Sequence, residues 1–102
     1  MDPHSLHVLL VDDEEPVREV LTRCLKSVGH EVLPAASGDE ALKLLEQTRV
    51  DLIVTDIRMP GMDGLTLLTQ ARARRPDVPV VVITGYASID SAVKAMRAGA
   101  VD

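Results

Sequence analysis

Short apolar runs alternate with amphipathic segments along the sequence, and this alternation most restricts the folds open to the chain. The runs at residues 6–11, 31–36, 52–55 and 78–84 are too short for helices and predict strands. Each run is followed by apolar residues at helical spacing, in segments that begin near Pro16, Ser37, Asp63 and Ser88. Four successive strand-helix units predict an α/β fold, with a parallel sheet covered on both faces and right-handed crossovers.

Local signals refine this prediction. Pro34 removes a backbone donor from the second strand, which favours a place at the sheet edge. Residues 37–40 (SGDE) have the form of a capping box, Pro60-Gly61 suits a type II turn, and Asp63 can cap the third helix. On the first helix we expect Cys24 to be a small buried hydrophobe on the apolar stripe, with Arg18 on the opposite, polar face.

Size and composition exclude several classes of protein. With 102 residues the chain is one domain, and its apolar runs are too short to span a membrane. No charged-then-apolar leader opens the sequence, so we expect a cytoplasmic protein. A net charge of -5 argues against nucleic-acid binding by this segment, and a single cysteine excludes an internal disulfide.

Polar residues stand where three of the predicted strands end. Asp12 and Asp13 follow the first strand, Asp56 the third and Thr84 the fourth. Ligands of such sheets bind at the carboxyl ends of the strands, so these groups could share one rim. Clustered carboxylates suit magnesium, and one of them could act as a nucleophile toward a phosphoryl group. The alternative is that the acidic pair only caps the following helix.

Three motifs resemble the receiver (phosphoacceptor) domains of two-component response regulators. Residues 10–14 (LVDDE) are similar to the family's acidic pair, residues 56–64 (DIRMPGMDG) to its phosphoacceptor loop, and residues 82–85 (VITG) to its switch strand. The resemblance runs from Val8 to Asp102. Residues 86–93 look most like receivers of the enhancer-binding class of bacterial transcription activators.

The resemblance implies a flavodoxin-like doubly wound sheet with strand order 2-1-3-4 in this chain. It also implies that Asp56 accepts a phosphoryl group from a sensor histidine kinase. Asp13, Asp56 and the backbone carbonyl of Arg58 would bind Mg²⁺ directly, and Asp12 would act mainly through a water. The Thr84 hydroxyl would contact the phosphoryl group and so switch a downstream effector domain or protein, in keeping with regulation of transcription.

The chain departs from the family at its C-terminal end. Receivers have five strand-helix units, whereas this sequence stops at Asp102, where the fifth would begin, so we expect residues 1–102 to be an incomplete receiver domain. The family's lysine and its switch aromatic would lie in the missing unit. Without a fifth strand, residues 80–83 would form an unpaired edge. Either the chain is part of a longer protein, or a partner chain covers this edge in a homodimer or a swapped assembly.

Three functions are compatible with these residues. The first is a signalling receiver, which is not a conventional enzyme because its only chemistry is its own phosphorylation and dephosphorylation. The second is a receiver-like interaction module that is never phosphorylated. The third is a small magnesium-dependent phosphohydrolase, which the absence of a suitably spaced second carboxylate after Asp56 and of a lid insertion disfavours.

Overall fold

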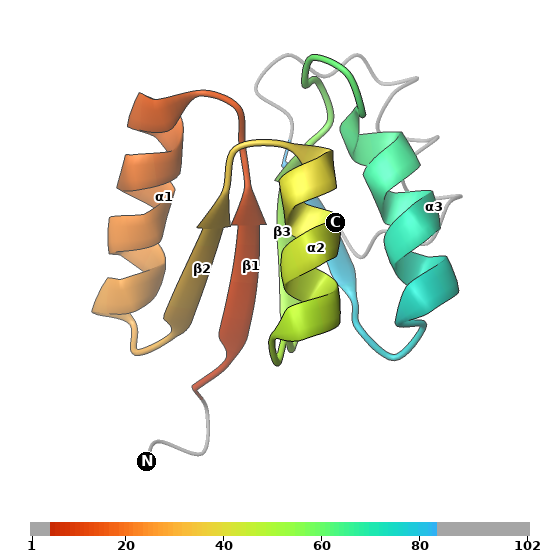
Figure 1. The fold of residues 1–102 in the computed structure, drawn as a ribbon. Helices are drawn as coiled ribbons and strands as arrows, with labels where there is room; N and C mark the ends of the chain where they lie inside the picture. The colour runs from red at the N-terminus through yellow and green to blue at the C-terminus, as the bar shows by residue number, and fades with distance from the viewer. Residues whose placement is uncertain (1–4, 84–102) are drawn as a thin grey trace.

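A computed structural model of the protein describes residues 5–83 (Figure 1). The first seven predicted elements are confirmed, with ends shifted by a few residues. The predicted helix after Ser88 lies outside the described residues. The elements are β1 (His7–Val11), α1 (Glu15–Ser27), β2 (Glu31–Ala35), α2 (Gly38–Gln47), β3 (Leu52–Asp56), α3 (Gly64–Arg74) and β4 (Val80–Ile83).

The four described strands form one parallel sheet in the order β2-β1-β3-β4, as predicted. β2 lies at an edge, where the missing N–H of Pro34 breaks no ladder on its outer side. Pro34 is in register with Leu10 of β1, and Leu10 in turn with Val54 of β3. Consequently β1 and β3 are neighbours and end at the same rim of the sheet.

Side chains of β1 alternate between two apolar clusters on opposite faces of the sheet. Leu9 and Val11 belong to the larger cluster, which includes α2 and α3, and Figure 1 shows these two helices together in front of the strands. Val8 and Leu10 form a smaller cluster with Val54, against which Leu21 and Leu25 of α1 pack. Strands buried on both faces are typical of doubly wound parallel sheets.

Local hydrogen bonds begin α2 and α3 where the sequence predicts. The Ser37 hydroxyl accepts the Glu40 N–H at 3.2 Å, and the Glu40 carboxylate accepts the N–H of Ala36, at 3.2 Å. At the start of α3, the Asp63 carboxylate accepts the Thr66 N–H at 2.8 Å. Each side chain satisfies an N–H that has no partner within the helix.

The prediction for α1 is wrong about which side chains face the sheet. Cys24 is exposed, and no residue of α1 is fully buried. The part of the helix that packs on the sheet runs through Leu21 and Leu25, and Cys24 points about 100° away from Leu25 around the helix. Because the apolar stripe is wider than the contact with the sheet, Val20, on the same side as Cys24, is 57% exposed.

None of the helices in the described part of the chain is long and apolar enough to cross a membrane.

Candidate functional site

Three carboxylates meet at the rim where β1 and β3 end. Asp12 and Asp13 follow β1, and Asp56 is the last residue of β3. One oxygen from each of these side chains lies within 4.8 Å of the other two. The adjacency of β1 and β3 therefore brings together side chains more than forty positions apart in sequence.

The members of this carboxylate cluster differ in exposure. Asp12 is 5% exposed, Asp56 is half-buried and Asp13 is exposed. Burial raises the pKa of Asp12, and the nearby charges of Asp56 and Asp13 raise it further, against the lowering effects of the Glu14 N–H and of Arg18. A divalent cation relieves such like-charge repulsion, and an all-oxygen donor set suits Mg²⁺, so the residues present fit this ion.

Three hydrogen bonds hold Asp12 in place. Its N–H donates to the Ala35 carbonyl at 3.1 Å, and its Oδ1 accepts the Glu14 N–H at 2.9 Å. Its carbonyl accepts a bond of 2.7 Å from Nη1 of Arg18. Asp12 is thus fixed through its backbone and its side chain at once.

The alternative role of the acidic pair, capping α1, is not seen. Glu14 is the N-cap residue of α1, and no side chain caps the helix through a hydrogen bond. The Asp12 carboxylate binds the N–H of Glu14 itself, one residue before the helix begins. Acidic groups here still face the positive end of the helix dipole, which is compatible with a metal-binding role.

The segment that follows β3 packs closely against Asp56 and Ile57. Oδ1 of Asp56 accepts the Arg58 N–H at 3.3 Å, and the Gly64 N–H donates to the Ile57 carbonyl at 2.7 Å. A Cβ atom on Gly64 would collide with the Asp56 carbonyl oxygen, so no other residue fits here without a shift of the backbone. Gly61 has a φ of 74°, as the predicted type II turn requires at its third position.

The predicted roles of two further site residues remain predictions. Thr84 lies outside the described residues. Arg58 is exposed, and the role of its carbonyl as a metal ligand stays a prediction.

Two residues that matter here were missed from the sequence. Arg18 was predicted to lie on the polar outer face of α1, but it is half-buried and bonded to Asp12. Gly64 is the last residue of the loop motif at residues 56–64, but its close approach to the Asp56 carbonyl was not predicted.

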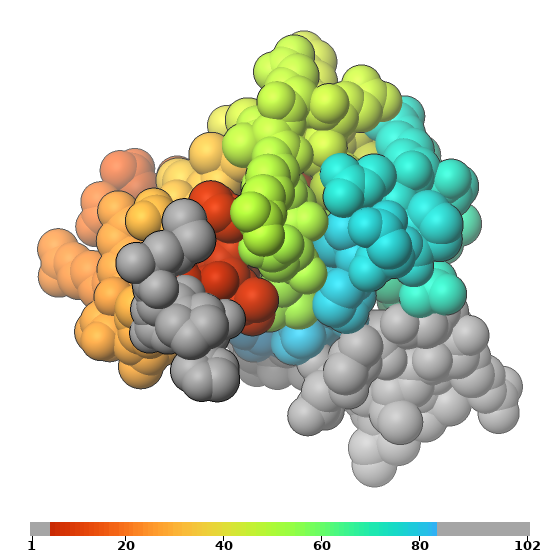
Figure 2. Space-filling model, turned by 90° about the horizontal axis from the view of Figure 1, so that it is seen from below, coloured from red at the N-terminus to blue at the C-terminus, as the bar shows by residue number. Residues whose placement is uncertain are grey.

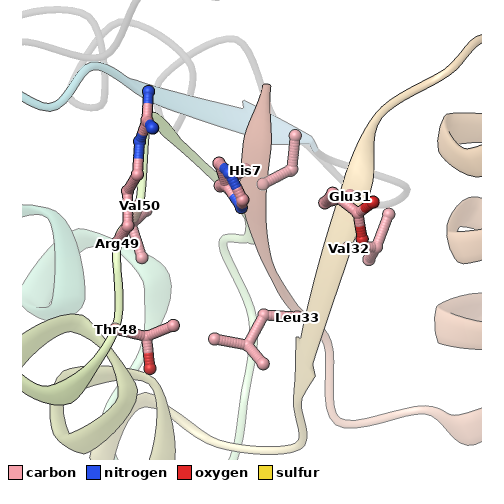
Figure 3. Close-up of a pocket in the computed structure, with 8 residues that line it drawn as sticks. His7, Glu31, Val32, Leu33, Thr48, Arg49 and Val50 are labelled. Carbon is pink, nitrogen blue, oxygen red and sulfur yellow. The ribbon is translucent and has the colours of Figure 1, made fainter. Parts of the chain in front are cut away.

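A cavity of about 130 Å³ lies at the other end of the sheet, between β1, β2 and the segment joining α2 to β3 (Figure 3). His7, Glu31 and Arg49 line it, with Leu33 on the apolar side. Viewed from this end, β1 (red) reaches the surface beside the yellow-green residues that follow α2 (Figure 2). His7 begins β1 whereas Asp12 follows its end, so the cavity is separate from the carboxylate cluster.

Comparison with known proteins agrees with this geometry. A family model described as the response regulator receiver domain matches residues 8–102. The response regulator protein FleR of Pseudomonas aeruginosa is 44% identical over 95 residues, which are 93% of this chain and 20% of FleR. The DNA-binding transcriptional regulator NtrC of Klebsiella pneumoniae is 43% identical over 93 residues, 91% of this chain and 20% of NtrC. The chain therefore spans about a fifth of these relatives.

Solved structures share the fold. A response regulator receiver protein from Pseudomonas putida superposes with a TM-score of 0.90 at 34% identity, covering 99% of this chain and 85% of that one. NtrX from Brucella abortus gives a TM-score of 0.90 at 37% identity, covering 96% of this chain and 23% of NtrX. The chain belongs to the response regulator receiver domain family of two-component systems.

Proposed function

We propose that this receiver accepts a phosphoryl group on Asp56 from a phosphohistidine of a sensor kinase, in a magnesium-dependent reaction. The observation that carries the proposal is the carboxylate cluster, in which half-buried Asp56 lies within reach of a shared ion with Asp12 and Asp13. In the transfer, a carboxylate oxygen of Asp56 forms a bond to phosphorus while the bond from phosphorus to the donor nitrogen breaks. The electron pair of that bond stays on the imidazole.

The residues at this rim would have different roles in the reaction. Asp12, Asp13, Asp56 and the carbonyl of Arg58 would hold Mg²⁺, which offsets the negative charge on the transferred oxygens. Asp12, buried and held by three hydrogen bonds, would supply a negative charge in a fixed position. Thr84 would donate its hydroxyl to the phosphoryl group and report the modification. Attack by water on the acyl phosphate would return the domain to its starting state.

We further propose that the output is control of transcription through a downstream effector domain or protein. The support is that FleR and NtrC are regulators of which this chain matches one fifth. The segment itself is acidic, with a net charge of -5, so contacts with DNA would be made elsewhere. Such a module works in the cytoplasm, where its kinase presents the donor.

Intact-mass analysis after incubation with Mg²⁺ and acetyl phosphate tests the proposal. We expect a single phosphoryl adduct that is absent from Asp56→Asn and from samples treated with a chelator. Asp63→Asn is the matched control, because it removes a carboxylate of the same loop while an asparagine can still cap α3. An adduct that persists in Asp56→Asn would refute the site, and no adduct in the wild-type chain would favour an interaction module without phosphorylation.

A further inference from the structure

We propose that Arg18 is a positioning residue for the metal-binding carboxylates, acting through the peptide group between Asp12 and Asp13. This inference rests on the proposed function and adds a residue of α1 to it. The Arg18 guanidinium bonds to a backbone oxygen beside the carboxylate cluster. It sets the direction in which the acidic pair points.

Arg18 bonds to the peptide group that joins Asp12 and Asp13. Nη1 donates to the carbonyl oxygen of Asp12 at 2.7 Å in half-buried surroundings. This oxygen belongs to the planar peptide unit that joins Asp12 to Asp13, and a peptide plane moves as a rigid body. Fixing the oxygen therefore restricts where the Cα atoms on both sides, and the side chains they carry, can point.

Arg18 also ties this peptide to the body of α1. Its own N–H donates at 2.9 Å to the carbonyl of Glu14, the N-cap residue of α1, while its side chain reaches back to Asp12. The N-cap side chain of α1 makes no capping bond. The Arg18 guanidinium links this helix to Asp12, the residue that follows β1. Because Asp13 is exposed, the orientation of its side chain depends more strongly on the restraint on its backbone.

Charge and position have opposite consequences for metal affinity, and this makes the inference testable. Arg18 is a cation near the site, since it lowers the pKa of Asp12. If its charge alone mattered, removing it would tighten Mg²⁺ binding, because one repulsive charge would be gone. If it positions the acidic pair, removing it weakens binding. Loss of groups that orient metal ligands typically costs about 10-fold to 100-fold in affinity.

Calorimetric titration of the full chain with MgCl₂ gives the measurement. We expect Arg18→Met, which keeps most of the apolar stem, to bind Mg²⁺ at least about 10-fold more weakly than the wild type. Arg18→Lys retains a charged donor and should recover much of the affinity. Arg23→Met removes a charge from an exposed position of the same helix and should leave the affinity within about 3-fold of the wild type.

Circular dichroism checks that each variant is folded, and Arg18→Gln repeats the test if the methionine variant is not. Affinity in Arg18→Met that equals or exceeds the wild-type value would overturn the inference, as would an equal loss in Arg23→Met. The phosphorylation assay separates the two proposals. A wild-type chain that takes up phosphate while Arg18→Met keeps its Mg²⁺ affinity refutes the role of Arg18 alone. A wild-type chain that neither binds Mg²⁺ nor takes up phosphate refutes both.

Discussion

Asp12 shows how one buried carboxylate links stability to pH. Its pKa is raised, chiefly by burial, so the folded state holds its proton more tightly than the unfolded chain does. Ionised Asp12 therefore destabilises the metal-free protein at neutral pH. This penalty disappears as the pH falls through the raised pKa and then through the ordinary value near 3.8.

Asp12→Asn should remove the penalty. Asn keeps an oxygen to accept the Glu14 N–H, and it no longer repels Asp56 and Asp13. We expect the free energy of unfolding in the presence of a chelator to rise at pH 7, because the raised pKa of Asp12 no longer opposes folding. Urea denaturation of the wild type and of Asp12→Asn measures this difference in the free energy of unfolding.

The same comparison at lower pH controls for effects other than charge. The gain in free energy of unfolding from Asp12→Asn should shrink as the pH is lowered toward 3. Asp12 is then protonated in both the folded and the unfolded state. Glu19→Gln, a carboxyl change at an exposed position of α1, should show no comparable gain. A gain that is independent of pH would show that packing, and not the raised pKa, is responsible.

At the scale of the elements, Gly64 sets how closely the start of α3 approaches the end of β3. A Cβ atom there would collide with the Asp56 carbonyl, so Gly64→Ala must displace the backbone that carries Asp56. We expect the free energy of unfolding to fall by about 2 kcal/mol, within the range for overpacked sites. Mg²⁺ affinity should fall as well, because Asp56 moves.

Thr66→Ala, an exposed change in the first turn of the same helix, is the control. It should affect stability by less than about 0.5 kcal/mol and leave Mg²⁺ binding intact. Wild-type stability and affinity in Gly64→Ala would contradict the close approach of α3 to Asp56.

The capping box at the start of α2 can be tested separately. Ser37→Ala removes the acceptor of the Glu40 N–H and should lower the free energy of unfolding by about 1 kcal/mol. Ser27→Ala is a matched control, because the Ser27 hydroxyl donates to the Cys24 carbonyl at the exposed end of α1, where water can replace it. Equal losses in both variants would argue against a specific capping effect.

How well the sequence predicts each element depends on the range of the interactions that form it. The starts of α2 and α3 were predictable, because Ser37 and Asp63 bond to N–H groups three residues away. The edge position of β2 followed from Pro34 alone. The rotation of α1 was not predictable: a broad apolar stripe does not reveal which part faces the sheet, and Cys24 and Arg18 were misplaced for this reason.

The carboxylate cluster was partly predictable. Strand ends indicated that Asp12, Asp13 and Asp56 share a rim, because parallel strands end on the same side of a sheet. Burial of Asp12 and the bond from Arg18 depend on the fold of residues 12–18 in three dimensions. No spacing rule encodes the reach of an arginine side chain back to a backbone carbonyl.

At the scale of the whole molecule, negative charge is concentrated at the rim where β1 and β3 end. The chain carries a net charge of -5, and three of its carboxylates are held within one metal-sized cluster. The cluster exists only in the folded state, since it joins residues from β1 and β3. An ion that binds there stabilises the entire domain by mass action, in proportion to the logarithm of its concentration over Kd.

Mg²⁺ should therefore raise the melting temperature. At ten times Kd the stabilisation is about 1.4 kcal/mol, which corresponds to about 6 to 11 °C for a domain of this size. Differential scanning calorimetry measures the shift, with NaCl at equal ionic strength as the control for simple screening. In Asp13→Asn the shift should largely vanish. A shift of equal size in NaCl, or in Asp13→Asn, would mean that Mg²⁺ acts on the net charge of the molecule, because only a specific site requires the Asp13 carboxylate.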